Sequence, residues 1–210
     1  MLEKQLVTVG EGSVSGFLHE PAEATGEALV LTHGAGSNAA APLLVGVADA
    51  FCAAGWTVLR CDLPFRQKRP SGPPHPSAAA QDREGLREAV AMMRSRGASK
   101  VVLGGHSYGG RQATILAAEA PGLADALLLL SYPLHPPKRP EQLRTAHFPA
   151  LRTPALFVHG TKDPFGSPEE MRAALSLIEA RTELRTVPGA GHDLARGKNE
   201  ANSLVPWFGH

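Results

Sequence analysis

Short apolar runs alternate with longer segments of helical periodicity along most of this chain, and this alternation limits the possible folds. The apolar runs lie at residues 28–32, 56–61, 101–103, 127–130, 155–158 and 183–187. Runs of this length are typical of strands buried on both faces of a sheet. Crossovers between such strands are right-handed and join parallel neighbours. The sequence therefore predicts an α/β fold with a doubly wound, mostly parallel sheet.

Helix signals fill the intervals between the apolar runs. The predicted helices span 42–54, 78–96, a segment that ends near residue 120, and a segment that begins at residue 167. Ser167 is suited to cap the last of these, because Pro168 fits the first helical position and Glu170 completes a capping box. The alternation of helix and strand is thus supported by helix boundaries as well as by periodicity.

Three segments depart from the alternation. Residues 6–9 and 14–18 flank a glycine-rich turn and predict an N-terminal β-hairpin. Residues 63–77 are rich in proline and predict a loop, and residues 133–154 are also rich in proline. We interpret residues 1–210 as a single domain.

Composition and charge exclude several classes of protein. The chain has 210 residues and a formal net charge of +1, which argues against nucleic acid as a partner. No run approaches about 18 consecutive apolar residues, and residues 1–6 lack the apolar core of a signal peptide. We therefore expect no membrane span and a cytoplasmic location. Cys52 and Cys61 fit no zinc or redox spacing, and we expect reduced packing residues.

The segment that follows the strand at 101–103 carries the strongest chemical signal. It reads Gly105-His106-Ser107-Tyr108-Gly109 and connects a strand to a helix. A serine on such a tight turn projects its hydroxyl beyond the sheet, and the flanking glycines avoid clashes there. The helix N-terminus favours developing negative charge. We predict that Ser107 is a nucleophile; the alternatives are a structural glycine turn or a phosphate-binding loop.

A serine nucleophile needs a base and an acid from other strand ends. His192 follows the last predicted strand and is the candidate base, with a surface histidine as the alternative reading. His135 is a weaker alternative base, and we interpret His159 as a packing residue. Asp163 follows the strand at 155–158 and would orient the imidazole; a turn residue before proline is the alternative. The order Ser107, Asp163, His192 is that of α/β hydrolases.

Two backbone N–H groups are needed to hold the oxyanion. We expect one from Tyr108, directly after the nucleophile. The other should come from the loop after the strand at 28–32, where Ala35 is the first choice and Gly36 the second.

The surroundings of this site predict an open cleft with a minimal lid. Residues 132–153 are too few for a cap domain, and no apolar stripe suggests a lipid interface. Basic side chains in nearby segments predict a cationic rim that attracts anionic acyl groups. The rim candidates are Arg66, Lys68, Arg69, Arg111, Lys138 and Arg139, with His135 as a further substrate contact. Solvated surface charge is the alternative.

With these motifs in place, the chain resembles the α/β-hydrolase superfamily. In detail it is similar to a small lidless branch, the KANL3/Tex30-like hydrolase domain, which is akin to dienelactone hydrolases. The segments that carry the resemblance are 32–36, 105–111, 131–137, 160–166 and 191–192. Members of the branch often have Lys or Arg before the serine and Met after it. The His106 and Tyr108 of this chain are closer to esterases.

We therefore expect a serine hydrolase, a carboxylesterase or thioesterase that acts on small soluble ester or thioester substrates. No cofactor and no metal are expected, because the His and acidic residues show no ligand spacing. A protein-interaction module that keeps the fold is the main alternative, since eukaryotic relatives act partly as subunits of larger assemblies. A lyase or haloperoxidase-like use of the same site is the other. The sequence carries no signal for the physiological substrate or the oligomeric state.

Overall fold

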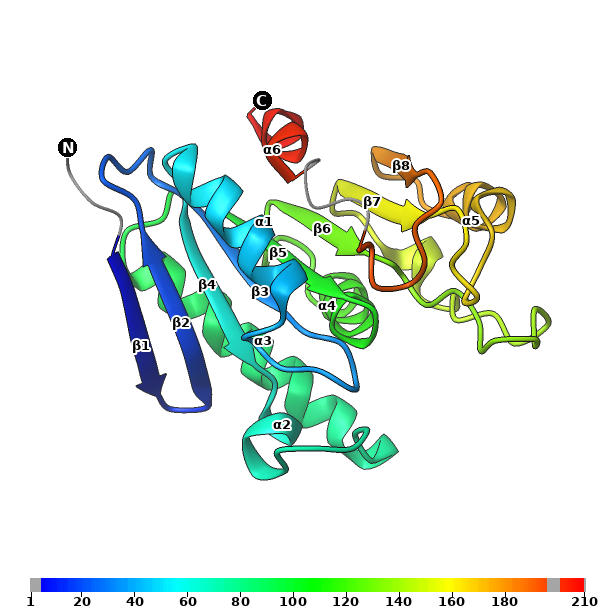
Figure 1. Ribbon diagram of the computed structural model, residues 1–210, viewed down its shortest axis with the longest axis horizontal. Helices are drawn as coiled ribbons and strands as arrows, with labels where there is room; N and C mark the ends of the chain where they lie inside the picture. Colours follow the sequence, from blue (N-terminus) through cyan, green and yellow to red (C-terminus); the bar gives the residue numbers. More distant parts are fainter. Residues whose placement is uncertain (1–4, 196–200, 210) are drawn as a thin grey trace.

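A single eight-stranded sheet organises the computed structural model, which describes residues 5–195 and 201–209. The strands are β1 (Gln5–Glu11), β2 (Val14–Glu20), β3 (Glu27–Thr32), β4 (Thr57–Asp62), β5 (Lys100–His106), β6 (Ala126–Leu130), β7 (Ala155–Gly160) and β8 (Thr182–Val187). Their spatial order is β1-β2-β4-β3-β5-β6-β7-β8 (Figure 1). β2 pairs antiparallel with β1 and with β4, and the other pairings are parallel. The predicted α/β fold with an N-terminal hairpin is confirmed.

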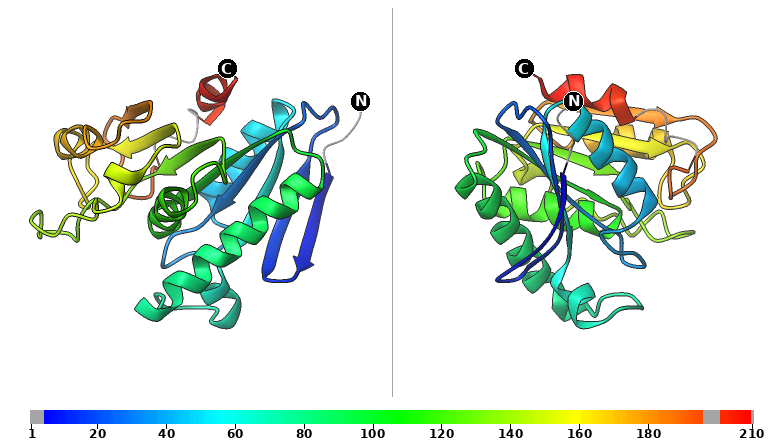
Figure 2. Two further views of the ribbon diagram at one scale, coloured as in Figure 1. Left: turned by 180° about the vertical axis from the view of Figure 1, so that it is seen from behind. Right: turned by 60° about the vertical axis from the view of Figure 1, so that its left-hand side comes forward.

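Helices cover both faces of this sheet. They are α1 (Pro42–Ala53), α2 (Pro64–Lys68), α3 (Ala79–Ser95), α4 (Tyr108–Glu119), α5 (Pro168–Leu175) and α6 (Ala201–Leu204). Figure 1 looks onto the face that carries α1, and the view from behind in Figure 2 shows α3 and α4 over the opposite face. α6 packs beside α1 on the first face, where buried side chains of both helices belong to one apolar cluster.

Strand side chains alternate between these two faces, as the pleat requires. In β3, Leu29 and Leu31 join the core beneath α1, whereas Val30 joins the core beneath α3 and α4. All three are fully buried. The central strands therefore read as continuous apolar runs because each face has its own core.

The strand order places a switch point between β3 and β5. From β3 the chain moves to β4 on one side and then returns to β5 on the other side of β3. Loops from β3 and β5 consequently leave the carboxyl end of the sheet in opposite directions. Ligands of open α/β sheets bind in the crevice at such a point.

The segment 63–77 differs from its predicted loop. It contains α2 (Pro64–Lys68), and a 3₁₀ turn (Pro76–Ala78) leads into α3. The prediction was wrong because it took Pro64 as a helix breaker. Pro64 occupies the start of α2, where its missing N–H costs nothing and its fixed φ favours the helix.

Other predicted features agree with the structure. Ser167 and Glu170 form the reciprocal capping box of α5, with distances of 2.7 and 3.2 Å. Between β6 and β7 the only described helical element is one 3₁₀ turn, Phe148–Ala150, so the lid is minimal. Cys52 and Cys61 are both buried and are not joined in a disulfide. Within residues 5–195 and 201–209, none of the helices combines the length and apolarity needed to cross a bilayer. Part of the signal-peptide expectation rests on residues 1–4, which lie outside the described residues.

Candidate active site

Ser107 occupies a strained turn between β5 and α4. Its φ is 50° and its ψ is −115°, a conformation that costs a non-glycine residue about 1–3 kcal/mol. The N–H of Ser107 donates to the carbonyl of Leu130 at 2.8 Å, which fixes the turn against β6. A Cβ on Gly109 would lie 2.5 Å from the carbonyl oxygen of His33, so only glycine lets α4 approach the β3 loop this closely. The turn is thereby held against both neighbouring strands.

The structure brings Ser107, His192 and Asp163 together. His192 Nε2 lies 2.8 Å from Ser107 Oγ, and His192 Nδ1 lies 2.8 Å from Asp163 Oδ2. The Asp163 side chain is fully buried, whereas the His192 side chain is 22% exposed. An acidic residue that accepts from Nδ1–H leaves Nε2 free to accept the serine proton.

The carboxylate of Asp163 is fixed on both oxygens. Its Oδ1 accepts from the N–H of Phe165 at 2.9 Å, while Oδ2 faces the imidazole. The loop that carries His192 reaches it because Gly160 ends β7: a Cβ at Gly160 would lie 2.4 Å from the Ala190 carbonyl oxygen. The close approach of the two loops sets the separation of acid and base.

Two aromatic side chains flank the imidazole of His192. The centroid of the Phe165 ring lies 4.2 Å from the centroid of the imidazole, with an angle of 32° between the ring planes. On another side, His106 Nε2 donates to the His192 carbonyl at 2.8 Å. Burial lowers the pKa of His106, so its imidazole is neutral near pH 7 and carries its hydrogen on Nε2. The residue before the serine thus anchors the loop of the candidate base.

The loop that follows β3 reaches the other side of Ser107. A Cβ at Gly34 would lie 3.4 Å from Ser107 Cβ. His33 Nε2 accepts from the Leu63 N–H at 3.1 Å, and its Nδ1 lies 2.8 Å from the Gly34 carbonyl. Burial lowers the pKa of His33, which keeps it neutral and able to accept. His33 therefore ties the loop after β3 to the loop after β4.

Tyr108, the first residue of α4, is held through its phenol. Tyr108 donates to Asp82 Oδ2 at 2.7 Å, and the Phe65 N–H donates to Asp82 Oδ1 at 3.0 Å. Burial raises the pKa of Asp82, and burial together with this carboxylate raises the pKa of Tyr108. The phenol is therefore a donor that fixes α4 against α2 and α3.

Arg66 does not form an exposed rim, and that prediction is wrong. Its side chain is buried, with 6% of the residue exposed. The guanidinium donates to the carbonyl oxygens of Ala35, Ser37, Arg69 and Gly72 at 2.7, 2.7, 3.0 and 2.9 Å. These bonds satisfy a buried cation with backbone oxygens, so Arg66 clamps the loop after β3 instead of meeting solvent.

His135 also departs from its predicted position. It is buried, its Nδ1 donates to the Pro136 carbonyl at 2.8 Å, and its Nε2 lies 3.5 Å from Glu170. The structure therefore does not present His135 as a substrate contact or a base. His159 is fully buried and donates to the Gly166 carbonyl at 2.8 Å, in agreement with a packing role.

The remaining basic candidates lie in different surroundings. Lys68 and Arg69 are exposed at the end of α2, and Lys68 donates to Gln81. Lys138 and Arg139 are exposed on a loop that projects outward from the body of the molecule (Figures 1 and 2). Arg111 lies one turn into α4, where its Nε is buried without a hydrogen-bond partner. The pairs Lys68–Arg69 and Lys138–Arg139 thus lie on separate segments, and the Arg111 N–H donates to the Ser107 carbonyl at 2.9 Å.

Three residues with clear positions at this site are not predicted by the sequence. His106, Asp82 and the clamp role of Arg66 all depend on contacts between distant segments. Only His106 carried a signal, because it lies inside the glycine-serine motif. Among the described residues, no group of three or more His, Cys, Asp or Glu side chains is arranged to hold a metal ion.

Comparison with known families agrees with this architecture. Residues 25–205 match the α/β hydrolase domain family, which covers most of the chain. The chain therefore belongs to the α/β-hydrolase family, and the predicted membership is confirmed.

Individual proteins and solved structures are similar to this chain over part or nearly all of its length. The chain is 32% identical over 122 residues to a Salmonella typhimurium protein provisionally named a carboxymethylenebutenolidase; the match covers 52% of this chain and 44% of that protein. A dienelactone hydrolase from Anabaena variabilis is 25% identical, with a TM-score of 0.76 and coverage of 99% and 98% of the two chains. A Xanthomonas campestris α/β serine hydrolase described as lacking a lid is 17% identical, with a TM-score of 0.70 over 98% and 95%, and shows the fold alone.

Proposed function

We propose that this protein is a serine hydrolase of ester-type bonds and that Ser107, His192 and Asp163 form its catalytic triad. The observation that carries the proposal is the pair of 2.8 Å contacts through the two nitrogens of His192. Their positions at the ends of β5, β7 and β8, in the order serine, acid, histidine, support the same reading.

The proposed reaction has two steps. Ser107 Oγ attacks the substrate carbonyl carbon while His192 Nε2 takes the serine proton. The negative oxygen of the tetrahedral intermediate accepts from the N–H groups of Tyr108 and Ala35. His192 then gives its proton to the departing oxygen or sulfur, which leaves an acyl-serine. Water then attacks the acyl carbon while His192 Nε2 takes one of its protons. The bond from the acyl carbon to Ser107 Oγ breaks, the carboxylic acid leaves, and His192 returns the proton to Oγ.

The substrate is proposed to be a small ester, thioester or lactone. The relatives named as a dienelactone hydrolase and a carboxymethylenebutenolidase support an ester-type bond. The minimal lid between β6 and β7 supports an open cleft. Arg66 lies buried beneath the loop after β3, so its charge no longer supports an anionic substrate.

The test is hydrolysis of p-nitrophenyl acetate. The proposal expects turnover by the wild type and a loss of about 10³-fold or more in kcat for folded Ser107→Ala. Normal turnover by Ser107→Ala would contradict the assignment. The absence of hydrolysis across ester, thioester and lactone panels would favour an interaction module on this fold.

A further inference from the structure

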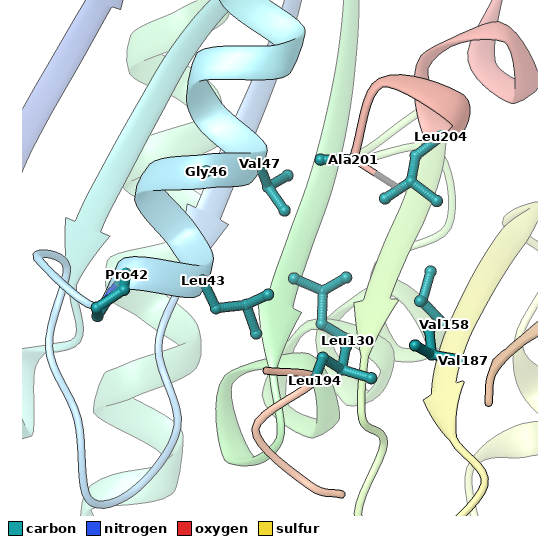
Figure 3. Close-up of a pocket in the computed structure, with 10 residues that line it drawn as sticks. All are labelled: Pro42, Leu43, Gly46, Val47, Leu130, Val158, Val187, Leu194, Ala201 and Leu204. Carbon is teal, nitrogen blue, oxygen red and sulfur yellow. The ribbon is translucent and has the colours of Figure 1, made fainter. Parts of the chain in front are cut away.

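Two adjoining hollows extend from the candidate active site along the sheet face under α1. The outer groove, about 390 Å³, is lined by residues from the loop after β3, the start of α1, His106 and residues 193–195. The inner pocket, about 100 Å³, lies between α1, α6 and the ends of β6, β7 and β8 (Figure 3). Pro42, Leu43 and Leu194 line both, so the two hollows adjoin at these three residues.

The outer groove begins beside the candidate nucleophile. Gly34 and His106 line it, and a Cβ at Gly34 would lie only 3.4 Å from Ser107 Cβ. The inner pocket also lies near Ser107, because Leu130 lines this pocket and its carbonyl accepts from the Ser107 N–H. A substituent that extends from the reacting carbonyl towards α1 therefore enters the outer groove.

The described side chains that line the inner pocket are all apolar. Its described lining consists of one glycine, Gly46, and residues with hydrocarbon side chains, among them Leu43, Leu130, Leu194 and Leu204. Figure 3 shows the side chains of Leu43 and Leu130 directed towards one another, with Leu194 beside Leu130. Water gains few hydrogen bonds in such surroundings, whereas a saturated chain loses none.

We propose that these hollows bind the aliphatic arm of the substrate ester. The end of the arm that is attached to the reacting ester group lies in the outer groove, and its far, saturated end lies between α1 and α6. The inference rests on the proposed function and names its substrate class: esters with an unbranched aliphatic arm. Each methylene that enters apolar surroundings raises kcat/KM by up to about fourfold. The arm is either the acyl chain or the alkoxy chain, and the experiment separates the two.

Gly46 offers a way to fill the inner pocket without disturbing the triad. A Cβ there meets no atom within 4 Å, although the residue lines the pocket. Replacement of a helix-interior glycine also favours the helix, so Gly46→Phe is expected to fold. Gly46→Ala adds only a methyl group and is the matched control. Leu43→Trp places a larger side chain at a position that lines both hollows, and Leu177→Trp, at an exposed position after α5, is its control.

The experiment measures kcat/KM for p-nitrophenyl acetate, butanoate and hexanoate, and for ethyl, butyl and hexyl acetate. The inference expects a rise of about 10- to 100-fold along one of the two series for the wild type. In Gly46→Phe and Leu43→Trp, the ratio of kcat/KM for the longest ester of that series to kcat/KM for the shortest should fall towards one, whereas both controls should keep the wild-type ratio. The series that rises identifies the arm.

Flat profiles in both series, or a rise that survives both blocking variants, would overturn the inference. Acetate hydrolysis by each variant and by Ser107→Ala is measured in parallel. If acetate hydrolysis depends on Ser107 while the profile is flat, the inference fails and the proposed function stands. If acetate hydrolysis does not depend on Ser107, the proposed function fails.

Discussion

His106 donates its Nε2 hydrogen to the carbonyl oxygen of His192 across 2.8 Å. One histidine directly precedes the candidate nucleophile and the other is the candidate base, so this bond joins the two loops that must stay in register. The centroids of the two imidazole rings lie 5.2 Å apart. The bond acts on the backbone of His192, not on its reactive nitrogens.

His106→Ala should therefore lower kcat without a comparable change in KM. Loss of a partner that orients a reacting group typically costs about 10- to 100-fold. His106→Gln, which keeps a donor at similar reach, should recover part of the loss. Steady-state kinetics on p-nitrophenyl acetate measure both, with His75→Ala at an exposed site as the control. Equal kcat values for wild type and folded His106→Ala would show that the bond is dispensable.

Asp163 and Ser107 should behave as parts of one unit. Asp163→Asn removes the acceptor for Nδ1–H and should lower kcat by about 10⁴-fold, the size of this effect in the protease template. The double variant with Ser107→Ala should be no worse than Ser107→Ala alone, since members of a unit are not additive. Kinetics of the single and double variants complete the cycle. Multiplied losses would mean that the two residues act independently.

Arg66 should control the geometry of the proposed oxyanion hole. Its guanidinium holds the carbonyl of Ala35, whose N–H is the proposed donor. Arg66→Lys keeps the charge but not the four directed bonds, so we expect a loss of about 1–3 kcal/mol in the free energy of unfolding. We also expect kcat to fall more than KM changes. Urea unfolding and kinetics measure these effects, and Arg69→Lys, which is exposed, is the control. Identical free energies of unfolding and identical kcat values for Arg66→Lys and Arg69→Lys would show that Arg66 does not hold the loop after β3.

His147 should make the protein less stable at acid pH. Burial lowers its pKa from 6.5 to about 4, and its Nε2 lies 2.8 Å from Thr114 Oγ1. Below about pH 6.5, His147 is protonated in the unfolded chain but stays neutral in the folded chain. The free energy of unfolding therefore falls as the pH drops towards 4. Because His147 is partly exposed, about 1–2 kcal/mol is a reasonable size for this loss.

Urea midpoints at pH 7.5, 5.5 and 4.5 measure this dependence. Other groups titrate in the same range, so the informative quantity is the difference between wild type and His147→Asn. The wild type should lose more stability than the variant between pH 7.5 and 4.5. Parallel curves would show that His147 does not carry the effect.

Much of the fold could be predicted because the local hydrophobic pattern of each strand matches its burial in the sheet. The apolar runs at β3, β5, β6 and β7 are buried on both faces, which is the condition that produces unbroken runs. The capping box at Ser167 is equally local. α2 was missed because a proline at a helix start and a proline in a loop look alike over five residues.

The positions of the candidate triad could be predicted for a related reason. Ser107, Asp163 and His192 each follow a strand, and parallel strands end at one edge of the sheet. The roles of Arg66 and Asp82 could not be predicted, since they depend on backbone groups that only the folded chain brings near. An arginine two residues before a lysine in a proline-rich segment has the pattern of surface charge, and only the folded chain brings the carbonyls of Ala35 and Ser37 to it.

The central claim is that His192 and Asp163 make Ser107 nucleophilic, and reaction with a fluorophosphonate tests it most directly. Intact mass and peptide mapping should find one adduct per chain, on Ser107, in the wild type. Ser107→Ala should remain unlabelled, and His192→Ala should react at least about 10²-fold more slowly. An adduct on another residue, or an unlabelled Ser107 in a protein that hydrolyses p-nitrophenyl acetate, would contradict the account.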